Sequence, residues 1–504
     1  MGSIFEKYLE TAVRVDPIKC VGHIIKVQGL LIESRGPQAI IGEMCRIEIK
    51  NYGSSSTSKF IQAEVVGLKG DIVQLMIYDE TGGIEIGCRV IASGSSLDVA
   101  VSTKLLGRVL DHLGKPVDGK GDIESSVRYP VLSNPPDPYK RPRIKERIST
   151  GIRAIDGLLA VGRGQRLGIF SGSGVGKSTL LGMIARNTNA DVNVVSFIGE
   201  RGRELNEFIE NDLGKEGLAR SVIVVTPSNS PPLARLRGAY VATAIAEFFR
   251  DQGLDVMFLF DSLTRFARAQ REIGLASGEP PATRGYTPSM FDSMPKLLER
   301  CGTSEKGTIT GFYTILVDGD DMDEPVSDTV RGILDGHVVL SRDLAQRNHY
   351  PAIDVLGSIS RLAKDVSGPK TKEAVRILRC LMADYANAED LINVGAYKLG
   401  TNAKIDEAIA KRDDIERFLV QSIEEKSIIN ETLSELGKIA GLEIPEDEME
   451  VYLPKMVFSA VKEDDLEEDF SLPEESPNEI SFVPEVLPSL ESESQLDIPL
   501  IDFG

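Results

Sequence analysis

The sequence predicts an α/β protein in which a domain built on a parallel sheet follows a small β-barrel and precedes a helical domain. Three observations predict this fold class. Residues 151–365 alternate strand-like and helix-like segments, the pattern of a parallel sheet covered by helices. Residues 20–98 contain short strand-like runs broken by Gly, Asn, Ser and Asp. Residues 366–440 consist mostly of helix formers.

The first expected element is an amphipathic helix over residues 1–18. Pro17 ends the segment, and its apolar residues recur at helical spacing: Ile4, Phe5, Tyr8, Leu9 and Ala12. The apolar face has two interpretations that the sequence leaves open. It either packs against its own domain or is offered to a partner protein.

Three domains are expected next. Residues 19–98 form the β-barrel, where runs such as HIIKVQGLLIES and IEIGCRVIAS alternate with turn residues. Residues 99–365 form the α/β domain, including a turn-rich linker that leads into it up to about residue 150. Residues 366–444 form the helical domain, because segments such as TKEAVRILRCLMADYANAED favour helix.

The last segment, residues 445–504, differs in composition from the rest of the chain. It contains 18 Asp or Glu, two Lys and seven Pro, whereas the preceding residues are nearly neutral. Dense like charge and frequent proline predict a largely disordered acidic tail. The stretch ISFVPEVLPSLESESQLDIPLIDFG mixes apolar residues with acid, so a set of docking segments that order on binding is the alternative.

Composition limits the class of protein. The chain has 504 residues, of which 41% are hydrophobic, and it lacks the run of 18 apolar residues that predicts a transmembrane helix. The start MGSIFEKYLE does not resemble a secretory signal. The five cysteines include no Cys-x-x-Cys pair, so we expect a reduced, cytoplasmic protein. The net charge of −20 argues against extensive nucleic-acid binding, which needs a basic surface.

A phosphate-binding loop is predicted at SGSGVGKST, between the apolar run QRLGIF and a helix. The pattern G-x-x-x-x-G-K-[ST] fits at Gly176, Lys177 and Ser178, although Ser171 stands at the first glycine position. Lys177 is expected on the β- and γ-phosphates, and Ser178 on Mg²⁺. A plain glycine-rich turn is the alternative, but it does not explain Gly-Lys-Ser at a helix start. The residues expected to contact the nucleotide are Gly172, Ser173, Gly174, Val175, Gly176, Lys177, Ser178 and Thr179.

Two further strands are expected to end at the edge that carries this loop, because parallel strands point their carboxyl ends the same way. The run DVMFLF delivers Asp261, as in the Walker-B strands whose carboxylate holds Mg²⁺. The stretch VVSFIGERGRE delivers Glu200, 23 residues after Lys177. A carboxylate at this place can orient or deprotonate the water that attacks the γ-phosphate.

The other charged residues of this stretch have separate interpretations. Arg201 either pairs with Glu200 or faces a phosphate group. Arg203 and Glu204 are interpreted as a local ion pair on the surface, which contributes little energy.

A resemblance extends over about residues 20–440 and includes TGIRAIDGLLAVGRGQRLGIFSGSGVGKSTLL, FRDQGLDVMFLFDSLTRFARAQREIGLASGEPP and ILDGHVVLSRDLAQRNHYPAIDVLGSISRL. The chain resembles the ATPases of the flagellar type III protein export apparatus, a branch of the rotary ATPase α/β subunit family. SGSGVGKST and TRGYTPS are closer to the flagellar branch than to the injectisome branch. The resemblance implies a RecA-like domain that hydrolyses ATP with Mg²⁺ inside a homohexameric ring.

The resemblance also implies roles for individual residues. Glu200 would be the water-activating carboxylate, with Arg201 beside it, and Arg265 in DSLTRF would lie near the catalytic phosphates. Arg361 in SISRL would be an arginine finger supplied by the neighbouring subunit, and Tyr350 would stack on adenine. From the residues alone, Arg361 is also readable as a paired surface arginine and Tyr350 as a packing residue.

The partners implied by the resemblance are a coiled-coil stalk protein in the ring's pore, stator proteins, export substrates and their chaperones. The acidic loop VDGDDMDEP would face that pore. The expected location is the cytoplasm, with peripheral association at the export gate of the inner membrane. No nucleic-acid partner is expected.

Three other functions fit part of the sequence. An injectisome secretion ATPase belongs to the same family. A non-catalytic nucleotide-binding ring subunit is disfavoured because Lys177, Glu200 and Asp261 are all present. An RNA-dependent hexameric helicase would need basic residues and stacking aromatics in its barrel, and residues 20–98 contain one phenylalanine and two tyrosines with mixed charge.

Overall fold

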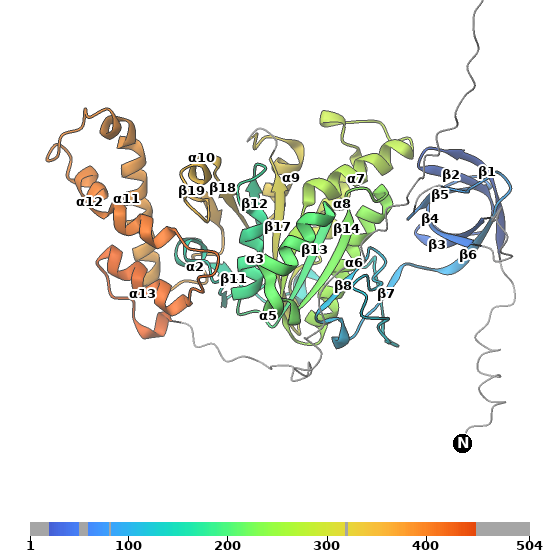
Figure 1. Cartoon of the computed structure of the whole chain (residues 1–504), viewed down its shortest axis with the longest axis horizontal. Helices are drawn as coiled ribbons and strands as arrows, with labels where there is room; N and C mark the ends of the chain where they lie inside the picture. Colours follow the sequence, from blue (N-terminus) through green and yellow to red (C-terminus); the bar gives the residue numbers. More distant parts are fainter. Residues whose placement is uncertain (1–19, 50–58, 80–81, 318–320, 450–504) are drawn as a thin grey trace, which may run out of the picture. The chain divides into compact units, whose positions relative to one another are not determined.

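The computed structural model describes residues 20–49, 59–79, 82–317 and 321–449. The helix expected at 1–18 lies outside these residues, as do the acidic tail after residue 449 and the middle of the acidic loop. Within the described ranges, no helix combines the length and apolar character needed to cross a membrane. The described elements follow the predicted order of barrel, α/β domain and helices (Figure 1).

The first domain is a closed barrel of six strands, which confirms the predicted fold class for this region. The strand order is β1-β2-β5-β4-β3-β6, and β1 closes the barrel by pairing with both β2 and β6. Ile32, Ala63 and Leu75 are fully buried inside it. The strand bounds are Val21–Gln28 (β1), Leu31–Arg35 (β2), Glu43–Ile49 (β3), Lys59–Lys69 (β4), Ile72–Ile77 (β5) and Arg89–Ser96 (β6).

The linker after the barrel folds into short elements. One of them, β8, joins the main sheet by pairing in parallel with β14 (Ser221–Pro227), and β7 pairs with β9. A strand at this position was not expected from the turn-rich sequence. The bounds are Asp98–Ala100 (β7), Thr103–Leu105 (η1), Arg108–Leu110 (β8), Arg128–Pro130 (β9), Pro138–Lys140 (η2) and Arg147–Ile148 (β10).

A buried ion pair connects the barrel to the α/β domain. Arg237 on α6 (Pro232–Asp251) donates from Nε to Glu64 Oε2 over 2.8 Å, and the Tyr78 hydroxyl donates to the same oxygen over 2.5 Å. Glu64 and Tyr78 are each 1% exposed. Burial and the Glu64 charge raise the pKa of Tyr78 well above its ordinary value, so the hydroxyl stays a donor.

The α/β domain is built on a sheet with the strand order β19-β18-β12-β17-β15-β13-β14-β8. All neighbours from β18 to β8 are parallel, and β19 is antiparallel to β18. The carboxyl ends of β12, β17, β15 and β13 therefore meet along one edge. The bounds are Arg166–Ser171 (β12), Val192–Glu200 (β13), Asp255–Asp261 (β15), Thr308–Leu316 (β17), Gly336–Leu340 (β18) and Ile353–Ser360 (β19), with Gly302–Thr303 (β16) paired to β17.

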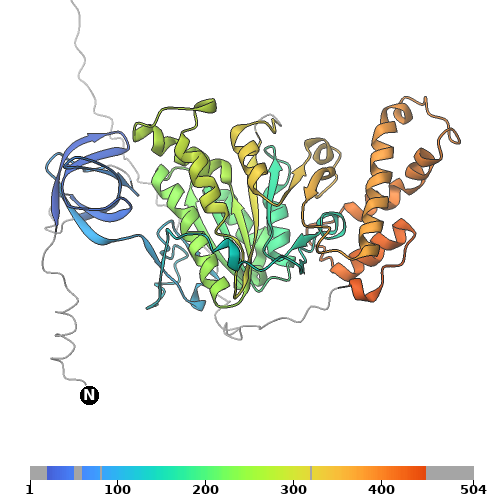
Figure 2. The same ribbon diagram turned by 180° about the vertical axis from the view of Figure 1, so that it is seen from behind.

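Helices lie against this sheet in both views of the molecule (Figure 1, Figure 2). The largest, α6, is buried along nearly its whole length and packs on β13, β14 and β15. The other bounds are Arg153–Leu158 (α2), Lys177–Asn187 (α3), Gly202–Glu207 (α4), Phe208–Leu213 (η3, a π-helical turn), Gly214–Ala219 (α5), Leu263–Ala276 (α7), Thr283–Gly285 (η4), Pro288–Leu298 (α8), Pro325–Ile333 (α9) and Arg342–Gln346 (α10), with Val161–Gly162 (β11) paired to β10.

The last domain is helical, as predicted. Its helices are α11 (Pro369–Asn393), α12 (Ala403–Leu419) and α13 (Ile429–Ala440), followed by the short turn η6 (Glu446–Glu448). Arg153 on α2 donates its backbone N–H to Gln421 Oε1 over 2.9 Å, which ties the α12–α13 connection to the α/β domain. The domain boundaries placed at residues 98, 365 and 444 stay predictions.

Candidate active site

The predicted phosphate loop connects β12 to α3. Gly174 (φ 78°) and Gly176 (φ 87°) adopt the left-handed backbone that favours glycine, and Val175 anchors the loop in the core at 2% exposure. Because α3 begins at Lys177, the loop N–H groups and the positive end of the helix dipole suit an anion here. Gly172 and Ser173 precede these residues, and Ser178 and Thr179 lie in the first helical turn.

The structure brings Lys177 to the ends of two other strands. The Lys177 ammonium contacts the Asp261 carboxylate at the end of β15 and lies 3.8 Å from Glu200 Oε1 at the end of β13. Asp261 is 1% exposed, and the Thr314 hydroxyl donates to its Oδ1 over 2.7 Å. Sequence reasoning missed Thr314. The sequence feature that could have identified it is a polar residue near the carboxyl end of the mostly apolar strand β17, TITGFYTIL, which lies between β12 and β15.

Glu200 is nearly buried, with 10% of its side-chain surface exposed. Its Oε1 has no hydrogen-bond partner among the described residues, although Arg265 Nε on α7 lies 3.6 Å away. Burial, followed by the charge of Asp261, raises the pKa of Glu200 to about 7, against the opposing charges of Lys177 and Arg265. A carboxyl with this pKa exchanges protons readily at neutral pH, as a general base must.

The remaining charges of this stretch are on the surface. Arg201, the residue before α4, has a side chain that is 77% exposed, and its Nη1 lies 3.4 Å from Glu204 Oε1. It therefore pairs with Glu204 and not with Glu200 in this structure. Arg203 Nε lies 3.5 Å from Glu207 Oε1. Arg203 and Glu204 are therefore both in surface ion pairs, but not with each other. The reason is helical geometry, since side chains three and four residues apart lie on one face.

Tyr350 and Arg361 lie in different places relative to the loop. A Cβ on Gly176 would be 3.5 Å from Tyr350 Cε1, so the tyrosine ring lies beside the phosphate loop. Arg361 follows β19, whose last residue pairs with Gly336 at the amino end of β18. Its guanidinium donates to the Arg331 carbonyl over 3.1 Å. Within one chain, therefore, Arg361 lies at the sheet edge opposite to Lys177.

The described part of the acidic loop is engaged within the chain. Arg284 Nη1 lies 3.0 Å from Asp321 Oδ2. Glu324 caps α9 by accepting from the Val326 N–H over 3.1 Å, and it also accepts from the Tyr286 hydroxyl over 3.0 Å. Glu324 therefore stabilises the start of α9.

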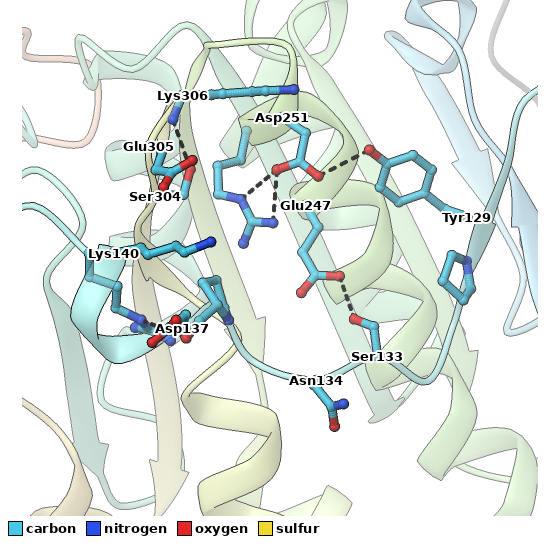
Figure 3. A pocket seen from close by; sticks show the side chains of 14 residues that line it. Tyr129, Ser133, Asn134, Asp137, Lys140, Glu247, Asp251, Ser304, Glu305 and Lys306 are labelled. Atoms are coloured by element: carbon cyan, nitrogen blue, oxygen red, sulfur yellow. Dashed lines mark hydrogen bonds and ion pairs between the residues drawn. The ribbon is translucent and has the colours of Figure 1, made fainter.

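A cavity of about 450 Å³ is lined in part by Asp251 and Lys306, which precede β15 and β17, and by no residue of the phosphate loop. Figure 3 shows the side chains that line it. Several of its polar groups pair with one another. Tyr129 donates to Asp251 over 3.0 Å, and Ser133 donates to Glu247 over 3.2 Å. Lys177, Glu200 and Asp261 do not line this cavity, so it is not the predicted nucleotide site.

Three family descriptions match consecutive parts of the chain. The beta-barrel domain of the ATP synthase alpha/beta family matches residues 24–94, and its nucleotide-binding domain matches residues 151–360. The C-terminal domain of the type III secretion ATPase EscN matches residues 367–438.

Individual relatives match most of the chain. The flagellum-specific ATP synthase of Treponema pallidum is 60% identical over 85% of this chain and 95% of its own length. That of Bacillus subtilis is 53% identical over 85% of this chain and 97% of its own length. The assembled ATPase EscN in complex with its central stalk EscO, from enteropathogenic E. coli, superposes with a TM-score of 0.76 at 43% identity. This match covers 83% of the chain and 100% of EscN in that structure.

Fold, loop and comparisons together define a P-loop ATPase. The chain belongs to the ATP synthase alpha/beta family, in the group that contains the flagellum-specific and type III secretion ATPases. The family resemblance inferred from the sequence is thereby confirmed.

The pKa of Glu200 predicts how ATP hydrolysis depends on pH. The ionised carboxylate is the form that accepts a proton, and its pKa of about 7 lies above the ordinary value. We therefore expect kcat/KM for ATP to fall about tenfold per pH unit below pH 7. Steady-state rates from pH 5.5 to 8.5, with enzyme shown to be folded throughout, measure this. A profile that stays flat down to pH 5.5 would contradict the assignment.

Thr314 predicts a second result. Replacing Thr314 by Val removes the hydrogen bond that orients Asp261, so we expect kcat to fall about tenfold, because a hydrogen bond to a charged group is worth about 1.5–3 kcal/mol. The matched control is Thr310→Val, because the Thr310 hydroxyl on the same strand accepts from the Gly164 N–H instead. Equal kcat values for the two variants would contradict the role of Thr314.

Proposed function

We propose that the chain is the ATP-hydrolysing motor subunit of a flagellar type III protein export apparatus. The main observation behind this proposal is that Glu200 lies nearly buried next to Lys177 and has a pKa of about 7. A ring subunit that only binds nucleotide has no need of such a carboxylate. The flagellar rather than the injectisome branch is supported by 60% and 53% identity to the flagellum-specific proteins of Treponema pallidum and Bacillus subtilis, against 48% to the type 3 secretion system ATPase of Xanthomonas euvesicatoria.

In the proposed mechanism the chain positions ATP and one water molecule. Lys177 moves from Asp261 to the β- and γ-phosphates, and the loop N–H groups hold the phosphate oxygens. Ser178 and Asp261 offer the hydroxyl and carboxylate oxygens that suit Mg²⁺, which supplies charge neutralisation at the phosphates when bound. Glu200 orients the attacking water and accepts its proton. Arg265, whose Nε lies 3.6 Å from Glu200 Oε1, stabilises the negative charge that develops on the phosphate oxygens.

Two further groups complete the proposed site. Tyr350, beside Gly176, provides an aromatic face for the adenine ring. Arg361 lies at the sheet edge opposite to its own phosphate loop, so in a ring it would serve the ATP of the neighbouring subunit. A homohexameric ring satisfies this requirement, and EscN is likewise an assembled ATPase.

The proposed partners follow from the same relatives. EscN forms a complex with a central stalk protein, so we propose a stalk protein for the pore of this ring as well. Stator proteins, export substrates and their chaperones complete the proposed set. The proposed location is the cytoplasmic side of the membrane export gate.

A mixing experiment tests the shared site. Glu200→Gln should lower kcat at least 100-fold and Arg361→Ala about 1000-fold, with little effect on nucleotide binding. When the two variants are mixed and reassembled, about a quarter of randomly formed interfaces join an intact Glu200 to an intact Arg361. ATPase activity should therefore return in the mixture and not in either variant alone. A mixture that stays inactive would contradict action from the neighbouring subunit.

An export assay tests the biological role. In a flagellated bacterium that lacks its own flagellar export ATPase, expression of the chain should restore secretion of flagellar subunits. Glu200→Gln, produced at the same level, should not restore it. Restoration of injectisome secretion alone, in a strain lacking that ATPase, would move the chain to the other branch.

A further inference from the structure

The backbone directly before Glu200 is enclosed by two arginine side chains. Gly199 has φ 73°, and the register between β13 and β14 shifts at this point. A Cβ on Gly199 would lie 3.0 Å from Arg265 Cδ and 3.6 Å from Arg235 Cδ. The stems of Arg265 and Arg235 therefore pack where a side chain at position 199 would stand.

Arg235 connects α6 to α7, and both helices contact β13. It lies in the first turn of α6, and its Nη2 donates to Glu272 Oε2 on α7 over 2.6 Å. The Arg235 side chain is 13% exposed, whereas that of Glu272 is 38% exposed. Glu272 follows Arg265 by seven residues, or two helical turns, so both lie on the same face of α7.

Arg235 also holds the loop that follows β14. Its Nε donates to the Ser230 carbonyl over 3.1 Å. In the same loop, the Ser228 N–H donates to the Glu200 carbonyl over 3.1 Å. Arg235 thus reaches the backbone at Glu200 in two ways, by packing on Gly199 and through the loop that binds the Glu200 carbonyl.

The backbone matters here because the Glu200 carboxylate has little to fix it directly. Its Oε1 lacks a hydrogen bond among the described residues, and its nearest cationic atoms, Arg265 Nε and Lys177 Nζ, are 3.6 and 3.8 Å away. The place of the carboxylate is therefore set mainly by Gly199 and Glu200 themselves. A displacement of about 1 Å in a catalytic group is enough to lower a rate about 100-fold.

We infer that Arg235 is a positioning residue for ATP hydrolysis, which fixes the backbone of Gly199 and Glu200 through Ser230 and Glu272 without touching the nucleotide. The inference rests on the proposed role of Glu200 as the residue that activates water. It assigns a function in the reaction to an arginine on α6, outside the phosphate loop and the strand ends.

The test compares Arg235→Met, Arg235→Lys and Glu272→Gln in the full-length chain. Arg235→Met should lower kcat about 30-fold while KM for ATP and the affinity for a non-hydrolysable ATP analogue change less than threefold. Arg235→Lys keeps a donor and a long stem, so it should recover part of this loss. Glu272→Gln keeps the size of the side chain and should lower kcat about threefold to tenfold.

The matched control is Arg271→Met. Arg271 is the neighbour of Glu272 on α7, and its guanidinium lies 5.2 Å from the centre of the Tyr286 ring. It is not among the nearest contacts of a Cβ at position 199. This variant should keep kcat within twofold of the wild type. Thermal unfolding of each variant gives the folded fraction to which kcat is normalised.

The outcomes separate the inference from the proposed function. A normalised kcat of Arg235→Met within twofold of the wild type would overturn the inference, and so would a rise in KM with unchanged kcat. If Arg235→Met does not fold, a normalised kcat of Glu272→Gln within twofold of the wild type would overturn the inference instead. Substantial turnover by Glu200→Gln would instead overturn the role of Glu200 itself.

Discussion

The ion pair between Lys177 and Asp261 is the contact on which the active site depends. It joins the start of α3 to the end of β15, two elements separated by 84 residues in sequence. The parallel sheet makes this possible, because β12, β17 and β15 are neighbours and end at one edge. Thr314 on the strand between them holds the Asp261 carboxylate. The order of the parallel strands therefore brings Lys177, Asp261 and Thr314 together.

Much of this arrangement could be predicted from the sequence, because it follows from local patterns. The phosphate loop, the strand before it and the acidic strand ends each have their own signature, and parallel topology places Glu200 and Asp261 together with Lys177. The barrel was predictable from short strands and turn residues, although its strand order was not. Pairing order depends on long-range packing that no short window contains.

Other features depend on three-dimensional detail that the sequence alone does not contain. Arg201 pairs with Glu204 because it is followed at once by a helix, which brings residues three apart together. The position of Arg361 depends on β19 being antiparallel, whereas the alternating pattern suggested a uniform sheet. Arg235 has no local signature, since its proposed role comes from its contacts with a glycine on strand β13 and a glutamate on helix α7.

The buried contact of Arg237 with Glu64 and Tyr78 has a consequence for the independence of the domains. The barrel supplies the counter-ion for a guanidinium inside the α/β domain, and removing one partner of a buried pair costs about 3–5 kcal/mol. That is a large fraction of the stability of a typical domain, about 5–15 kcal/mol. The contact therefore couples the stability of the two domains. A barrel with an apolar residue at position 64 would leave Arg237 without its counter-ion.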